Sequence, residues 1–97
     1  MNCIAFLVIS PLDKGPSLSD YVKAAVDVIR KSGVKYQVTS MGTIVEAEDP
    51  GEVFRIVQEG VDAVKKLGSS RVSVSVKLDC RYDKEATMES KVQALEP

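Results

Sequence analysis

The sequence contains no histidine and no tryptophan, and only two of its 97 residues are cysteines. Histidine is a frequent general base in enzymes and a frequent zinc ligand, so its absence lowers the expectation of catalysis and of a zinc site. Cys3 and Cys80 are too far apart for a CxxC motif, and two cysteines do not make the disulfide framework of a small secreted protein. We therefore expect no metal and no cofactor, although Glu, Asp or Lys chemistry stays open.

Strong net charge and long apolar runs are also missing. The formal net charge is -1, which gives no electrostatic reason to expect nucleic acid or a membrane as a partner. No apolar run approaches the roughly 20 residues of a membrane-spanning helix. The apolar stretch 3–9 follows no basic segment and precedes no small-residue cleavage site, so it is typical of a buried strand. We expect a cytoplasmic protein.

The composition that remains is that of a globular domain. Hydrophobic residues make up 44% of the chain and charged residues 28%, as in ordinary soluble domains. A chain of this length can bury only a modest core. We expect one ligand-binding domain over residues 1–84, followed by a short C-terminal helix or tail over residues 85–97.

Hydrophobic periodicity predicts strands and helices in a definite order. The strand Asn2–Ser10 is apolar on both faces, which is typical of a central strand covered on both sides. A helix capped by Ser17 or Ser19 follows, and Gly33 ends it. The later elements are a hairpin turning at residues 41–42, a helix 49–68 with an Asp-Pro start, a strand 71–80 and a terminal helix capped by Thr87.

This order predicts an α+β domain. Right-handed crossovers turn it into a four-stranded antiparallel sheet with two helices on one face, the ferredoxin-like βαββαβ fold. The first and third strands are then central, and the second and fourth lie at the edges. The face without helices would carry an apolar patch of Ile4, Phe6, Val8 and Ile44. Such a patch packs against another subunit or binds something.

Glu46 stands among apolar residues on a central strand, where a carboxylate needs a partner. One interpretation pairs it with Lys77 or Arg71 at an interface. The other makes it a counter-charge for a cationic or amino-bearing small ligand. Gly42, in the preceding turn, would let a ligand approach the backbone closely.

Three segments resemble those of one known family, the small thiamine-binding proteins. They are SLSDYV at 17–22, KYQVTSMGTIVEAE at 35–48 and SSRVSVSVKLDCRYD at 69–83. The resemblance extends to about Asp83. It implies a stand-alone ferredoxin-like domain that binds thiamine or its pyrimidine without catalysis and assembles through its sheet into dimers and tetramers.

The resemblance also implies a set of ligand-binding residues. Thr43 and Glu46 would form the centre of the site, and Ser10, Ser19 and Tyr36 match family positions more loosely. A carboxylate could neutralise the thiazolium or accept from the exocyclic amine, and a tyrosine could stack on the pyrimidine. The chain departs from the family pattern at two positions: Ala47 follows Glu46 where the family often has Gly, and no Pro precedes Met41.

Two other functions remain open at this stage. A phosphate-ester hydrolase on the same fold would need an arginine in the first loop, where Lys14 is the only basic residue. A structural or interaction module would use the bare sheet face only to oligomerise, and the expected assembly is a dimer of dimers.

Cys3 and Cys80 should lie close together as buried, unbonded thiols, since a cytoplasmic setting keeps thiols reduced.

Overall fold

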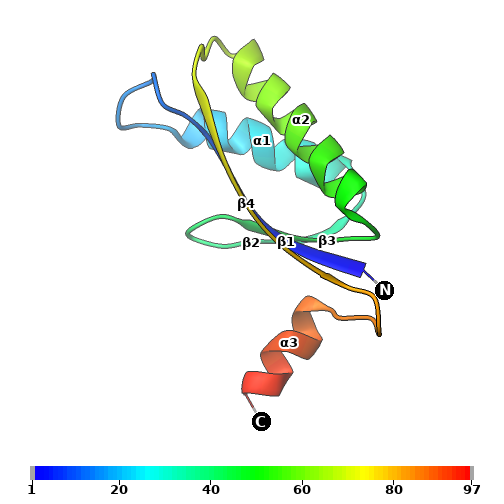
Figure 1. Cartoon of the computed structure of the whole chain (residues 1–97). Helices are drawn as coiled ribbons and strands as arrows, with labels where there is room; N and C mark the ends of the chain where they lie inside the picture. Colours follow the sequence, from blue (N-terminus) through cyan, green and yellow to red (C-terminus); the bar gives the residue numbers. More distant parts are fainter. Residues whose placement is uncertain (1, 97) are drawn as a thin grey trace.

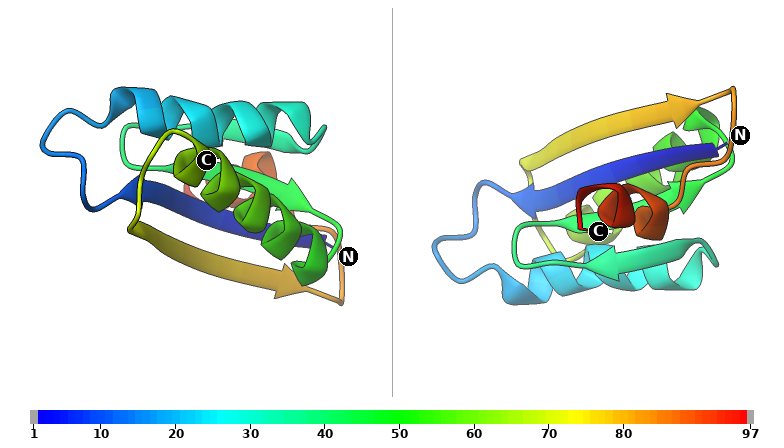
Figure 2. Two further views of the ribbon diagram at one scale, coloured as in Figure 1. Left: turned by 90° about the horizontal axis from the view of Figure 1, so that it is seen from above. Right: turned by 90° about the horizontal axis from the view of Figure 1, so that it is seen from below.

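The computed structural model describes residues 2–96. Its elements are β1 (Asn2–Pro11), α1 (Ser19–Lys31), β2 (Lys35–Val38), β3 (Thr43–Ala47), α2 (Pro50–Lys66), β4 (Val72–Arg81) and α3 (Met88–Leu95). The strands form one antiparallel sheet in the order β2-β3-β1-β4. Helices α1 and α2 cover one face, and α3 lies on the other (Figures 1 and 2). The ferredoxin-like prediction is confirmed, including its central and edge strands.

The core lies between the sheet and the pair α1 and α2. On β1 the residues Cys3, Ala5, Leu7 and Ile9 are buried there, while the residues between them are half-buried on the other face. Gly60 of α2 brings helix and sheet close together, because a Cβ at this position would lie 2.7 Å from the Ile9 side chain.

The two long helices begin differently. The Asp49 side chain accepts a hydrogen bond of 2.9 Å from the Glu52 N–H, as the capping motif predicts. At α1 the N-cap residue is Leu18, and no side chain caps the helix. The prediction of Ser17 or Ser19 as the cap was therefore wrong. Ser19 is already the first helical residue, where its side chain cannot serve as the cap.

Helix α3 begins beside the sheet face that the other helices leave bare and projects away from that face (Figure 1). The Asn2 side-chain amide anchors the segment before α3, donating to the Ala86 carbonyl at 2.6 Å and accepting from the Ala86 N–H at 2.9 Å. Ala86 and Met88 are buried, whereas residues 89–96 are exposed. The face is therefore covered only at the start of α3, and the four residues of the expected patch are each half-buried. Within residues 2–96 no helix is long and apolar enough to cross a membrane.

Cys3 and Cys80 form a disulfide. They lie directly opposite each other in the β1–β4 ladder, with their Cα atoms 4.0 Å apart. Their proximity was predicted correctly, but the prediction of free thiols was wrong. That prediction relied on an assumed compartment, whereas the strand register points both side chains to the same face at the same level.

Candidate functional site: a pocket beside the hairpin loop

Strand β3 sends its side chains alternately to the two faces of the sheet. Thr43, Val45 and Ala47 point toward α1 and α2 and are buried. Ile44 and Glu46 point toward the opposite face, beside which α3 begins. The two residues at the centre of the predicted site therefore lie on opposite sides of the sheet.

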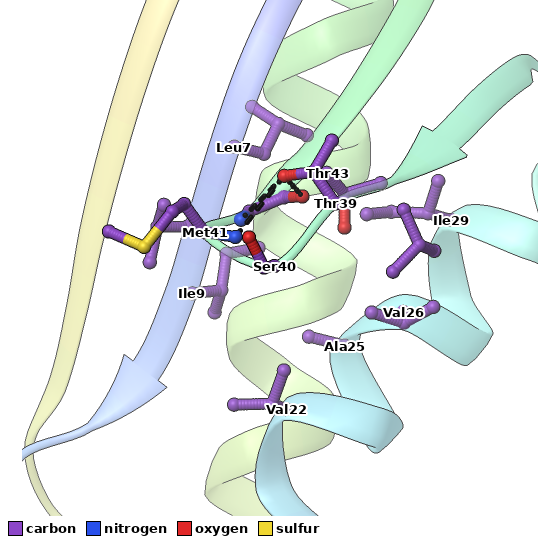
Figure 3. Close-up of a pocket in the computed structure, with 13 residues that line it drawn as sticks. Leu7, Ile9, Val22, Ala25, Val26, Ile29, Thr39, Ser40, Met41 and Thr43 are labelled. Atoms are coloured by element: carbon purple, nitrogen blue, oxygen red, sulfur yellow. Dashed lines mark hydrogen bonds between the residues drawn. The ribbon is translucent and has the colours of Figure 1, made fainter. Parts of the chain in front are cut away.

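A pocket of about 220 Å³ opens between α1 and the hairpin loop that joins β2 to β3 (Figure 3). Its apolar wall comes from β1 and α1. The side chains of that wall include Leu7, Ile9, Val22, Ala25, Val26 and Ile29. Its polar groups come from the loop and the start of β3, residues 39–43.

Hydrogen bonds within the loop hold this polar edge in one conformation. The Thr39 hydroxyl donates to the Gly42 carbonyl at 2.7 Å and accepts from the N–H groups of Met41 and Gly42, each at 3.2 Å. The Thr39 N–H also donates to the Gly42 carbonyl, at 2.9 Å. The loop is therefore fixed before any ligand arrives, which lowers the entropy cost of binding.

Gly42 is required by packing. A Cβ at this position would lie 2.5 Å from Cζ of Phe6 and 3.0 Å from the Leu7 carbonyl oxygen. A side chain fits in that space only if the Phe6 ring moves or if the loop shifts away from β1. The glycine noted in the sequence thus lets the loop approach the protein's own strand.

Thr43 supplies the free polar group of the pocket. Its side chain is 4% exposed, and no protein group among residues 2–96 forms a hydrogen bond with its hydroxyl. No fully buried side-chain oxygen or nitrogen among these residues lacks a partner, so the Thr43 hydroxyl keeps some exposure to the pocket that it lines, where a ligand or water can pair with it. The described residues that line the pocket carry no charge. The site is therefore suited to a small, flat, neutral group with one or two hydrogen-bonding positions.

Glu46 performs a different task on the other face. Its carboxylate lies 3.7 Å from the Lys35 ammonium and accepts a hydrogen bond of 3.4 Å from the Met88 N–H, at the first residue of α3. Lys35 lies directly opposite on β2, so the expected partners Lys77 and Arg71 were wrong. The side chain is only 12% exposed. A carboxylate at a helix N-terminus is favourable, so Glu46 helps to hold α3 on the sheet.

Ion pairs on either side reinforce this attachment. Lys35 also pairs with Glu89 of α3, and this contact raises the pKa of Lys35 and lowers the pKa of Glu89. Lys91 of α3 pairs with Asp79 of β4 at 2.6 Å and lowers the pKa of Asp79. All these groups except Glu46 are well exposed, so each pair is weak alone. Together they attach the N-terminal part of α3 to the sheet, while the remainder of the helix is exposed.

The remaining predicted ligand residues lie outside the pocket. Ser10 is on the α3 face of β1, opposite Ser73, and Ser19 is exposed at the start of α1. Tyr36 packs against the core, and its hydroxyl accepts a hydrogen bond of 3.1 Å from Arg30. Of the five predicted residues, only Thr43 lines the pocket.

Sequence reasoning missed the other half of the site. It assigned the apolar stripe of α1 to the core, and it placed Thr39 and Ser40 on the strand that precedes the turn at residues 41–42. The signal that could have found the pocket is the pairing of Leu7 with Thr43, which puts that hydroxyl under α1 and beside the turn. Within residues 2–96 no group of acidic, cysteine or histidine side chains has the arrangement of a metal site.

Comparison with known proteins gives a consistent match. The family described as "Thiamine-binding protein" matches residues 5–96. The chain belongs to this thiamine-binding protein family. One relative is the UPF0045 protein of Methanothermobacter thermautotrophicus, 39% identical over 92 residues, which cover 94% of this chain and 93% of the relative.

Solved structures of similar proteins have the same fold as this thiamine-binding-family chain. A hypothetical protein from Methanocaldococcus jannaschii superposes with a TM-score of 0.88 at 38% identity, covering 97% of this chain and 95% of that one. A Thermotoga maritima protein, whose name suggests thiamine biosynthesis or salvage, superposes with a TM-score of 0.84 at 22% identity, covering 99% and 100%. At that identity the second likeness shows the fold alone.

Proposed function

We propose that this chain binds thiamine, or the aminopyrimidine that forms half of it, without catalysing a reaction. The observation that carries the proposal is the Thr43 hydroxyl, which has no protein partner and lines a preformed pocket in a thiamine-binding-family chain. Pockets for drug-sized ligands measure roughly 300–1,000 Å³. A pocket of about 220 Å³ therefore suits one heteroaromatic ring better than a whole thiamine molecule.

The charge of the pocket decides which ring enters. Thiamine joins a neutral aminopyrimidine to a permanently cationic thiazolium. Burying the cation would need a carboxylate nearby, and the described lining has none. The pyrimidine thus enters beneath α1, and its ring nitrogens or amine meet the Thr43 hydroxyl and the loop backbone. The thiazolium stays at the mouth, beside the exposed side chains of Val22, Val38 and Met41.

A homo-oligomer, most simply a dimer of dimers, completes the proposal. The half-buried apolar residues of the sheet face and the exposed Val92 and Leu95 of α3 together give that face more apolar surface than a monomer needs.

Calorimetry against a matched set of ligands tests the function. The set contains thiamine, its mono- and diphosphates, the free aminopyrimidine alcohol and the free thiazole alcohol. We expect the pyrimidine and all three thiamine forms to bind with similar affinity, and the thiazole not to bind. Binding of none of them, or of the thiazole alone, would overturn the proposal.

A further inference from the structure

The ring of Phe6 lies over Gly42, at the end of the loop that borders the pocket. Phe6 pairs with Ile44 in the β1–β3 ladder, so Gly42 occupies the diagonal position on the same face, which an aromatic side chain can reach. The ring fills the space of the missing side chain, because a Cβ at Gly42 would lie 2.5 Å from Cζ of Phe6 and 2.8 Å from Cε1. An aromatic ring that covers a glycine in a sheet stabilises that position.

Gly42 lies just beyond the β1–β3 ladder, whose last pair is Leu7 and Thr43. Its N–H donates to the Thr39 hydroxyl at 3.2 Å, and its carbonyl accepts from the same hydroxyl at 2.7 Å (Figure 3). These two bonds join one part of the loop to another part of the loop. The contact with the Phe6 ring, in contrast, joins the loop to the central strand of the sheet.

Phe6 reaches this loop from outside the pocket. The described residues that line the pocket include Gly42 and both of its neighbours, Met41 and Thr43, but not Phe6. The Phe6 side chain is half-buried on the opposite face of the sheet, the face that α1 and α2 leave bare. The ring and a ligand in the pocket would therefore lie on opposite sides of the same piece of backbone.

We propose that Phe6 is a positioning residue for the ligand pocket: its ring, packed on Gly42 from the opposite face of the sheet, holds the loop 39–42 in the binding conformation. The inference rests on the proposed function, in which the loop backbone and the Thr43 hydroxyl meet the pyrimidine. Without the ring, Gly42 gains the space that the ring filled, and a glycine has the backbone freedom to use it. The loop must then be ordered when the ligand binds, which lowers the affinity.

This role makes the pocket sensitive to the far side of the sheet. Phe6 belongs to the half-buried apolar residues of the bare face, together with Ile4, Val8 and Ile44. A change on that face that moves the Phe6 ring also moves Gly42, and with it the residues on either side that line the pocket. Affinity for the ligand therefore depends on a side chain that the ligand does not touch.

Nuclear magnetic resonance of the free protein tests whether Phe6 holds the loop. Phe6→Leu removes the ring and keeps an apolar side chain. We expect the backbone order parameters of residues 40–42 to fall from about 0.85 toward 0.6 in this variant. Ile4→Val is the matched control, because Ile4 lies on the same face of β1 but opposite Glu46, away from the loop. Unchanged order parameters in Phe6→Leu, or an equal fall in Ile4→Val, would overturn the proposal.

Calorimetry with the free aminopyrimidine alcohol measures the effect on binding. We expect Phe6→Leu to bind roughly threefold to tenfold more weakly than the wild type, about the cost of ordering one more backbone residue, and Ile4→Val to bind as the wild type does. Equal affinity in Phe6→Leu and the wild type would overturn the proposal. If the wild type binds no member of the ligand set, the proposed function fails, while the order parameters still decide whether Phe6 holds the loop. If Phe6→Leu fails to fold, Phe6→Met, which also lacks the ring, replaces it in both measurements.

Discussion

Thr43 and Glu46 lie on opposite faces of β3, one beneath α1 and the other against α3. Glu46 lies three positions after Thr43, an odd offset, so the two side chains point to opposite faces and cannot contact the same ligand within one chain. The first two predictions use this separation to assign each residue its role.

Thr43→Val should weaken the binding of the aminopyrimidine by about threefold to tenfold, the effect of one lost hydrogen bond. Valine keeps the shape of the side chain, so thermal stability should be equal to or above that of the wild type. Calorimetry measures the affinity. Ser10→Ala, on the other face, is the control and should bind as the wild type does. Unchanged affinity in Thr43→Val would remove this hydroxyl from the site.

Glu46→Gln should leave pyrimidine affinity unchanged and loosen α3. The amide side chain loses the attraction of Lys35 and is a weaker acceptor for the Met88 N–H. Hydrogen exchange across residues 86–92 should accelerate by roughly fivefold, corresponding to about 1 kcal/mol. The opposite pattern, with lost affinity and unchanged exchange, would support the ligand-binding role inferred from the sequence.

The fold could be predicted from the sequence because its signals are local. The apolar strand at the start, the Asp-Pro cap and the helix-ending glycines each depend on a few neighbouring residues, and their order leaves few topologies. The partner of Glu46 was not predictable in this way. It depends on Lys35 being directly opposite across the hairpin and on the chain returning to bring Met88, the first residue of α3, against Glu46, and both are features of the tertiary structure.

The pocket could not be predicted from the sequence, for a related reason. Val22 and Ala25 have the spacing of ordinary core residues, and periodicity does not show where a core contains a space. Periodicity likewise could not predict whether the two cysteines are bonded to each other. Their bonding depends on the level at which Cys3 meets Cys80 in the ladder.

Gly42→Ala should destabilise the fold by about 1–3 kcal/mol, the usual cost of overpacking. The added methyl group would clash with the Phe6 ring. Thermal unfolding measures the loss, and Phe6→Leu in the same chain should recover part of it by removing the atoms that clash. A Gly42→Ala variant as stable as the wild type would show that the loop can shift without cost.

Removing the disulfide should lower the free energy of unfolding by about 4 kcal/mol, since the bond closes a loop across a sequence separation of 77 residues. Urea unfolding of the wild type and of the Cys3→Ala/Cys80→Ala variant measures the difference. Thiol titration of the unfolded wild type should find no thiols until a reductant is added. Two thiols without a reductant would show that the bond does not form.

Asp13→Asn should lower stability at neutral pH and have less effect in acid. The Asp13 carboxylate accepts hydrogen bonds from the Ser70 N–H and from the hydroxyls of Ser69 and Ser70, and these hold its pKa far below the ordinary value. A depressed pKa stabilises the fold above the unfolded-state value of about 4 and loses this effect as the pH falls below it. Thermal unfolding should show that the variant loses more stability relative to the wild type at pH 7 than at pH 3. An equal loss of stability at the two pH values would show that the charge of Asp13 is not the cause.

The central position of β1 has a consequence for how the protein is made. Both of its neighbours in the sheet, β3 and β4, come later in the chain, and β4 is the last strand. A nascent chain must therefore carry its most apolar segment unpaired while nearly everything else is being synthesised. Contacts so distant in sequence form slowly, and exposed strands favour aggregation in the meantime. Chaperone access during translation should therefore affect the yield of this protein more than its final stability would suggest.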